Sequence, residues 1–487
     1  MSFLTRKEDT ERPRRRKRQG DRGEQGSSDG WRGLRGVVGR LLLAGSMLAA
    51  LSAPGAAGAE AKPAQAATEL QPIIDAAEPG GEIVLAAGSY SGPAVVEKPL
   101  TIRGEEGATL YGGEEAAALT VRAAGSTVRG VKIVSRGTGS VAAIAVEADD
   151  VVIERTTIES SGLGISLRDA DRATVAGNAV YPVTDAAGSA AGLAARTGNG
   201  IDLYDSHDAA IRDNEVHGMK DGIYLEKSHR AVIEANRIYR SRYGIHCMYT
   251  DGTLIKGNEG EFNVTGAMVM GVRDAVVTDN SFRKQSENVH SQGLLLFDVQ
   301  TSRVERNTFE GNRVGIYMEL SSNNRLEGND VLRNFVGVQF LESSDNVFSG
   351  NVFLANVIEA QATDSAGNRL ANNYWDAAQA LDKDGDGLSD LRYAINPFFE
   401  RAADRTPAYQ LFFQSPGMTF LSGLFTADEA EWSADSAPLM NMPEDTGALT
   451  EVWNGKPRDG GDAAVGAIGA ALALGAILTI YLGVRKT

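Results

Sequence analysis

Two short segments near the middle of the chain hold residue types that could bind a soft metal ion. Residues 243–249 read YGIHCMY, and residues 266–270 read GAMVM. A histidine and a methionine of the first segment each stand 22 residues before a methionine of the second. One imidazole and three thioethers form a ligand set that suits Cu(I) and discriminates against calcium and magnesium. The candidate copper ligands are therefore His246, Met248, Met268 and Met270.

The 22-residue separation is the period of a repeat that must position these side chains. Each copy has a Gly, alternating apolar residues, a polar turn, a β-branched pair and then an Asn, as in 222–236 and 315–329. Six of the eight intervals between these asparagines are 22 residues, and the positions are 178, 214, 236, 258, 280, 307, 329, 351 and 373. Each copy is too short to bury a face alone, so the copies must stack, with strands about 4.8 Å apart. The inward asparagines can then bridge neighbouring coils.

This repeat predicts an all-β protein, a right-handed parallel β-helix with about 22 residues per coil. A leucine-rich repeat has a similar period, but it needs several leucines and a helical segment in each turn, and the copies have neither. We expect a short helix over residues 70–77 to cover the first coils. The last coils should end near Tyr374 and Trp375, where aromatic rings can seal the stack.

The alternation of side chains along a strand decides which residues face outward. Ile245, Cys247 and Met318 should point into the solenoid, where a buried thiol or thioether is ordinary packing. The four candidate ligands should then point toward water on neighbouring coils. Exposed methionine, leucine and phenylalanine could equally form a docking patch for a protein, because methionine adapts to different partners. The residues alone leave three possibilities open: protein docking, metal binding, or a chance pattern with neither function.

Two further segments offer ligands. Five extra residues between Asn280 and Gly293 bring in His290, which could close over the patch as a lid or as an additional ligand. Residues 382–390 read DKDGDGLSD, with carboxylates at loop positions 1, 3, 5 and 9 as in a calcium loop, although position 12 is Tyr393. We expect a structural Ca²⁺ site there, and an acidic surface turn is the alternative. Its ligands would be Asp382, Asp384, Asp386 and Asp390.

Composition excludes several classes of protein. The 487 residues include 48 Lys+Arg and 64 Asp+Glu, a net charge of −16, which suits a nucleic-acid backbone poorly. A single cysteine excludes an intrachain disulfide. With 42% hydrophobic residues, the chain is neither disordered throughout nor a membrane protein with many spans.

The two ends carry membrane signals, and they divide the chain. Residues 1–59 have a basic start, an apolar stretch and an A-x-A end, typical of a signal peptide. Residues 463–484 lack charge and precede Arg485 and Lys486, so we expect a transmembrane anchor with a cytoplasmic C-terminus. Between them we expect a β-helix over 60–375, a cap with the Asp-rich loop over 376–425 and an acidic, solvated linker over 426–462. The bulk of this single-pass protein would lie on the extracytoplasmic side of the cell membrane.

Catalysis is not expected. Enzymes that act on acidic polysaccharides need clustered carboxylates, but Asp202, Asp205, Asp208, Asp213 and Asp221 are spread over different turns. Residues 1–59 carry +6, so the mature chain has a charge of −16 − 6 = −22 and would repel a polyanion. A membrane-anchored surface β-helix that binds or cleaves acidic polysaccharide remains the alternative function.

These residues resemble the NosD family, β-helical accessory proteins of nitrous oxide reductase maturation. The resemblance covers roughly residues 70–425, and its most specific points are YGIHCMY, GAMVM, GLLL at 293–296, NYWD at 373–376 and SPGM at 415–418. It implies an extracytoplasmic protein that works beside an ABC-type ATPase and its permease and helps deliver copper, sulfur or both to nitrous oxide reductase. A small copper chaperone is a further implied partner. It also implies copper handling by His246, Met248, Met268 and Met270.

Overall fold

The computed structural model describes residues 67–184, 198–286, 288–413, 415–425 and 432–443. The predicted signal peptide (1–59) and the predicted anchor (463–484) lie outside these ranges. Within them, no helix combines the length and apolar character needed to cross a membrane.

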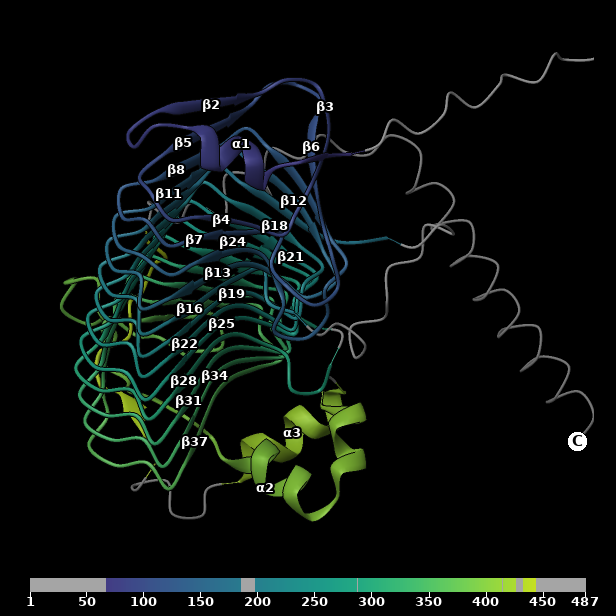
Figure 1. Ribbon diagram of the computed structural model, residues 1–487. Helices are drawn as coiled ribbons and strands as arrows, with labels where there is room; N and C mark the ends of the chain where they lie inside the picture. The colour runs from purple at the N-terminus through teal and green to yellow at the C-terminus, as the bar shows by residue number, and fades with distance from the viewer. Residues whose placement is uncertain (1–66, 185–197, 287, 414, 426–431, 444–487) are drawn as a thin grey trace, which may run out of the picture. The chain divides into compact units, whose positions relative to one another are not determined.

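The chain winds into coils, and each coil adds one short strand to each of three sheets that are parallel except at one end (Figure 1). The 12-stranded sheet consists of β4 (Ala94–Val96), β7 (Leu119–Val121), β10 (Ala142–Val146), β13 (Leu163–Arg168), β16 (Ile201–Tyr204), β19 (Asp221–Glu226), β22 (Tyr243–Met248), β25 (Thr265–Met270), β28 (Gln292–Phe297), β31 (Val314–Glu319), β34 (Val336–Leu341) and β37 (Ile358–Thr363).

The other two sheets form the remaining walls of the solenoid. The 14-stranded sheet consists of β1 (Thr68–Glu69), β3 (Gly88–Ser91), β6 (Ala108–Gly112), β9 (Lys132–Ser135), β12 (Thr157–Ser160), β15 (Ala179–Pro182), β18 (Glu215–His217), β21 (Arg237–Tyr239), β24 (Glu259–Glu261), β27 (Ser281–Arg283), β30 (Thr308–Glu310), β33 (Asp330–Leu332), β36 (Val352–Leu354) and β39 (Tyr374–Trp375). The 15-stranded sheet consists of β2 (Glu82–Leu85), β5 (Thr101–Gly104), β8 (Thr127–Arg129), β11 (Val152–Glu154), β14 (Thr174–Ala176), β17 (Ala210–Arg212), β20 (Val232–Glu234), β23 (Leu254–Lys256), β26 (Val276–Thr278), β29 (Arg303–Glu305), β32 (Arg325–Glu327), β35 (Val347–Ser349), β38 (Arg369–Ala371), β41 (Ala434–Asp435) and β40 (Tyr393–Ala394).

The predicted asparagines form a continuous buried ladder between coils. Asn258 shows the pattern: its Nδ2 donates to Oδ1 of Asn280 at 2.9 Å and to the Ile233 carbonyl at 2.9 Å. Its own Oδ1 accepts the backbone N–H of Asn236 at 2.9 Å. Because an unpaired polar group in this interior would be costly, the ladder fixes the 22-residue register.

The repeated glycine is required by the close stacking of coils. A Cβ at Gly244 would lie 2.4 Å from the carbonyl oxygen of Gly266, and one at Gly266 would lie 2.5 Å from that of Gly293. Behind these glycines, Ile245, Cys247 and the equivalent residues of other coils form one buried core. The register within the 12-stranded sheet is thereby fixed as well.

Both ends of the stack are covered. The helix α1 (Gln71–Ala76) lies at the first coils, and its Ile74 joins the core, as predicted for 70–77. At the other end, Trp375 stacks on Phe353 with ring centroids 4.0 Å apart. The elements α2 (Phe398–Arg405), η2 (Pro407–Phe412) and α3 (Pro416–Leu424) follow, and Phe413 packs on the last coils.

Part of the range predicted to be a solvated linker belongs to this cap. Asp435 is fully buried, and its Oδ2 accepts hydrogen bonds from Nδ2 of Asn373 at 2.8 Å and Nε1 of Trp375 at 3.0 Å. The carboxylate thus replaces the next asparagine of the ladder. Asp435 is distant in the sequence from Asn373 and Trp375, so the acidic composition of the predicted linker does not reveal this contact.

Candidate metal site

The strand register brings the four candidate ligands together. In β22 and β25, His246 lies opposite Met268 and Met248 lies opposite Met270. Adjacent strands are about 4.8 Å apart, and positions i and i+2 roughly 6.8 Å, so these long side chains can converge on one ion. We refer to His246, Met248, Met268 and Met270 as the histidine–methionine cluster.

The cluster lies on the outer face, but half of it is shielded from water. Met248 and Met270 are half-buried, whereas His246 is only 6% exposed and Met268 8%. The expectation that all four face water is therefore wrong for His246 and Met268. For His246 the cause is aromatic cover: the rings of Tyr224 and Tyr243 meet the imidazole edge-on at 5.0 and 4.8 Å.

The imidazole of His246 is anchored from one side only. Its Nδ1 lies 3.1 Å from Oδ2 of Asp221, a carboxylate that is only 1% exposed. Arg242 donates to both oxygens of Asp221, each at 2.8 Å. Burial opposes ionisation of Asp221, but the hydrogen bonds from His246 and Arg242 outweigh it and lower its pKa. The other ring nitrogen, Nε2, is buried and has no hydrogen-bond partner in the described part of the chain.

A free nitrogen lone pair beside thioether sulfur is a suitable arrangement for Cu(I). An ionised carboxylate only accepts hydrogen bonds, so it favours the tautomer of His246 with the proton on Nδ1, and in that tautomer Nε2 presents its lone pair. Carboxylate–histidine pairs of this kind orient metal ligands in proteins. The hydroxyl of Tyr224 has one proton, which goes to Glu226 at 2.8 Å more favourably than to the sulfur of Met248 at 3.5 Å. The residues present therefore fit a soft metal ion.

The two stacked histidines on another side of the solenoid lack this arrangement. His207 and His229 have ring centroids 5.2 Å apart. Nδ1 of His207 accepts the backbone N–H of His229 at 3.1 Å, and Nδ1 of His229 accepts that of Asp251 at 3.0 Å. A neutral ring that accepts at Nδ1 carries its proton at Nε2, so these rings act as rungs of a turn ladder.

The other sulfur and imidazole side chains near these coils are two core residues and one residue of an exposed loop. Cys247 and Met318 are buried in the core, as predicted, and burial raises the pKa of the Cys247 thiol to about 12. His290 is exposed in the loop after β27, where its backbone N–H donates to Oδ1 of Asn288 at 2.9 Å.

The Asp-rich loop brings three of its four predicted ligands together. Ligand atoms of Asp382, Asp384 and Asp386 lie within 4.8 Å of one another. The carboxylate of Asp390 instead accepts the backbone N–H of Lys383 at 2.8 Å. Tyr393, at loop position 12, stacks on Trp375 at 4.8 Å.

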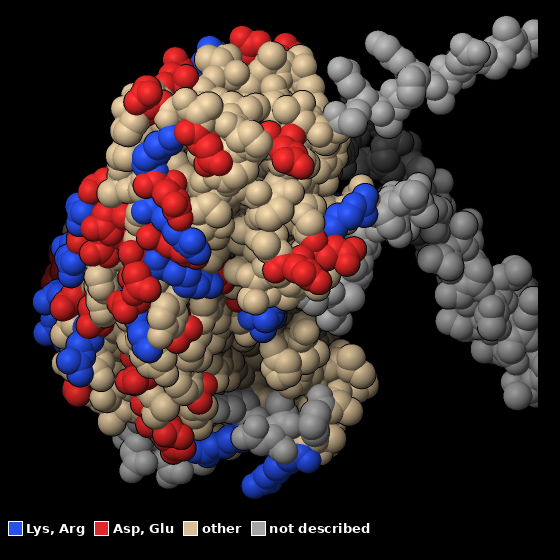
Figure 2. All heavy atoms as spheres, in the orientation of Figure 1, with Lys and Arg blue, Asp and Glu red and all other residues tan. Residues whose placement is uncertain are grey.

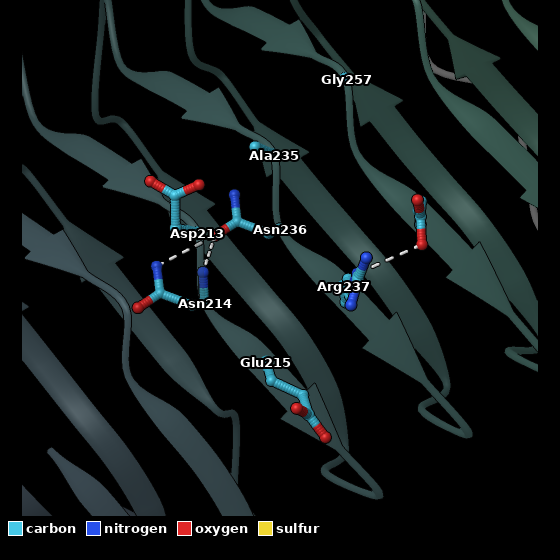
Figure 3. A pocket seen from close by; sticks show the side chains of 8 residues that line it. Asp213, Asn214, Glu215, Ala235, Asn236, Arg237 and Gly257 are labelled. Atoms are coloured by element: carbon cyan, nitrogen blue, oxygen red, sulfur yellow. Dashed lines mark hydrogen bonds and ion pairs between the residues drawn. The ribbon is translucent and has the colours of Figure 1, made fainter. Parts of the chain in front are cut away.

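A surface hollow of about 360 Å³ lies apart from the cluster (Figure 3). It forms where Ala235 and Gly257 leave room beside Asn214 and Asn236, whose amides belong to the ladder. The carboxylates at its rim include Glu259, which pairs with Arg237 at 3.3 Å. This hollow is a gap in the turn rather than an extension of the metal site.

From the sequence, Asp221 is one of several scattered acids, and Arg242 has no assigned role. A signal was available, since Asp221 stands 22 residues before Tyr243 and therefore at the same edge of the sheet, beside the strand of His246.

The fold and the site together define a parallel β-helix with a partly shielded cluster of soft ligands on its outer face. Residues 183–383 match a family model described as "Periplasmic copper-binding protein (NosD)", and residues 106–259 match one described as "Right handed beta helix region". The "Probable ABC transporter binding protein NosD" of Pseudomonas aeruginosa is 32% identical over 411 residues, which cover 75% of this chain and 90% of that protein. The chain belongs to the NosD family. The family's description places its members in the periplasm, outside the cytoplasm.

Solved structures with similarity to the chain are more distant. The family 28 exopolygalacturonase of Yersinia enterocolitica is 12% identical, with a TM-score of 0.47 over 62% of this chain and 74% of that one. The surface adhesin PfbA of Streptococcus pneumoniae is 13% identical, with a TM-score of 0.42 over 62% and 86%. Neither carries an inference about function.

Proposed function

We propose that this chain is an extracytoplasmic accessory protein that holds Cu(I) during assembly of the copper site of nitrous oxide reductase. The observation that carries the proposal is the buried Nε2 of His246, which has no hydrogen-bond partner within the described ranges, on a residue that lies opposite Met268 in register. The proposal includes no catalysis by the chain itself. In support, the buried carboxylates of Asp202 and Asp221 on this face are each held by an arginine, so neither is free to act as an acid or a base.

The cluster has two levels that suit capture and release of an ion. Met248 and Met270 are half-buried and can be reached by a partner, while His246 and Met268 lie deeper. Cu(I) would first meet the accessible thioethers and then exchange to the shielded pair. A small copper chaperone would be the donor, and nitrous oxide reductase would be the acceptor. Sulfur remains a second cargo that the same scaffold could serve.

An ABC-type permease and its ATPase are the proposed partners at the C-terminal end. Residues 406–425 contain no Asp, Glu, Lys or Arg, and this part of the surface is mostly uncharged, in contrast to the mixed charges along the solenoid's flank (Figure 2). Such an exposed apolar patch is typical of a docking surface. Its large exposed side chains are Tyr409, Leu411, Phe412, Phe420, Leu421 and Leu424.

The outer face connects this end to the cluster. Phe297 follows Met270 in register on β28, and Val314 and Val336, further along the same sheet, pack with Phe413.

We propose that residues 463–484 tether the chain to the membrane after cleavage of residues 1–59. The Asp-rich loop is proposed to hold a structural Ca²⁺ ion.

Titration of the full chain in mild detergent with Cu(I), against a chromophoric Cu(I) chelator, tests the copper proposal. The variant Met248→Leu/Met268→Leu/Met270→Leu should lose most of the binding, because leucine keeps the apolar volume and removes the sulfur. Met318→Leu, inside the solenoid, is the matched control and should bind as the wild type does. Equal binding by the wild type and the triple variant would refute the copper proposal.

A further inference from the structure

Asp221 lies outside the cluster, yet it determines what the cluster offers to a metal ion. It is located in β19, one coil before His246, and its two oxygens are shared by Arg242 and the imidazole. Arg242 also lies over the ring of Tyr243, 4.4 Å from its centroid, and Tyr243 covers the imidazole. The carboxylate, the guanidinium and the ring therefore form one packed unit that holds His246 still.

We infer that Asp221 is a positioning residue that keeps the His246 proton on Nδ1 and so leaves Nε2 unprotonated for Cu(I). This inference rests on the proposed function and deepens it. Without a carboxylate at this place, a neutral imidazole is free to carry its proton on either nitrogen, and the tautomer protonated at Nε2 has no lone pair there. His207 and His229 of this chain are held in that opposite form by backbone donors.

The variant Asp221→Asn removes the carboxylate with little change in shape. Oδ2 of Asp221 accepts from both Arg242 and the imidazole, so an amide opposes one Arg242 donor whichever way it is turned. Where its NH₂ group faces His246, Nδ1 accepts and the proton moves to Nε2. Loss of such a supporting carboxylate typically lowers metal affinity about 10- to 100-fold. We expect a loss of that size for Cu(I).

Two measurements on the full chain in mild detergent test the inference. The first is long-range ¹H–¹⁵N correlation of histidine-labelled protein at pH 8, with His246→Asn used to assign the signal. Wild-type His246 should be protonated at Nδ1, and Asp221→Asn should show a population protonated at Nε2. The second is Cu(I) competition with a chromophoric chelator. Asp202→Asn, which changes another buried carboxylate on the same face, should stay within about twofold of wild type.

The outcomes of the two measurements are separable. Wild-type His246 protonated at Nε2 would overturn the inference without any variant, even if Asp221→Asn failed to fold. Wild-type affinity in a folded Asp221→Asn protein would also overturn it. If the wild type bound Cu(I) no better than His246→Asn, the proposed function would fail, while the tautomer measurement would still decide the role of Asp221.

Discussion

Nδ1 of His246 lies 3.1 Å from Oδ2 of Asp221, and both side chains are buried on the outer face of the 12-stranded sheet. A buried carboxylate is weak evidence for stability, because removing its charge from water is costly. Here Arg242 completes the carboxylate's partners, whereas Nε2 of His246 has no hydrogen-bond partner among the residues that the structure describes. The arrangement is therefore better understood as holding a ligand ready than as strengthening the fold.

The two levels of the cluster predict different effects for two similar substitutions. Met268→Leu should lower the equilibrium affinity for Cu(I) about tenfold, or about 1.4 kcal/mol, because Met268 is buried and lies opposite His246 in register. Met270→Leu should change affinity less and should slow transfer of Cu(I) to an added chelator, because Met270 is less buried. Competition titration and stopped-flow transfer measure the two effects. A loss of affinity as large in Met318→Leu would show that the effect is not local.

The sequence was sufficient for the solenoid because the repeat expresses its own packing rule. Asn258 and Asn280 stand one coil apart in the sequence and bond to each other. The alternation of residues along the strand directs Ile245 and Cys247 into the core. It was not sufficient for the burial of His246, which depends on how Tyr224 and Tyr243 turn their rings over it. No periodicity in sequence specifies such rotamers.

A second asparagine ladder could have been found from the same 22-residue spacing. Asn312, Asn334 and Asn356 bond to one another from coil to coil. The ladder is irregular at Gln285, whose Oε1 is buried without a partner in the described residues. This irregularity falls on the coil that carries the five-residue insertion, which obscures the spacing. The contact of Asp435, in contrast, does not follow the spacing of the repeat, so the repeat does not predict it.

Asn258→Ala should destabilise the solenoid strongly. It takes from the buried Asn236 N–H and the Ile233 carbonyl the partner that Asn258 supplies, and it removes an acceptor of Asn236 Nδ2. Oδ1 of Asn280 keeps the backbone N–H of residue 258. Each unsatisfied buried group costs about 1–3 kcal/mol, so we expect a loss of about 3 kcal/mol or more. Urea unfolding followed by circular dichroism measures it, and the exposed Asn288→Ala should change stability by less than about 0.5 kcal/mol. Similar midpoints for both variants would contradict the structural role of the ladder.

Ca²⁺ should stabilise the Asp-rich loop and the cap around it. Backbone N–H groups of Gly387 and Gly385 lower the pKa of Asp382, which favours the ionised form that binds a cation. Saturating Ca²⁺ at about 100 times the dissociation constant should add about 2.7 kcal/mol to the unfolding free energy of the bound unit. Scanning calorimetry with and without Ca²⁺ measures the shift. Asp384→Asn should abolish the Ca²⁺-dependent shift, and Asp364→Asn, at an exposed site, should retain it. If the wild type shows no shift, the loop is an acidic turn without a bound ion.

Asp330 should make the protein less stable as the pH rises from about 4 to about 6. Burial raises the pKa of its carboxyl to about 6, whereas the unfolded chain titrates near 3.9, so the folded state binds the proton more tightly. The proton-linked stability is present below the unfolded pKa and is lost as the pH passes through the folded one. Asp330→Asn, which is uncharged throughout, should therefore be more stable than the wild type at pH 7.5, by about 1–2 kcal/mol, and the difference should vanish near pH 4. Urea midpoints at both pH values measure this. An equal stability difference at the two pH values would mean that the pKa of the Asp330 carboxyl is not raised. Asp364→Asn, at an exposed site, is the control for the loss of a charge.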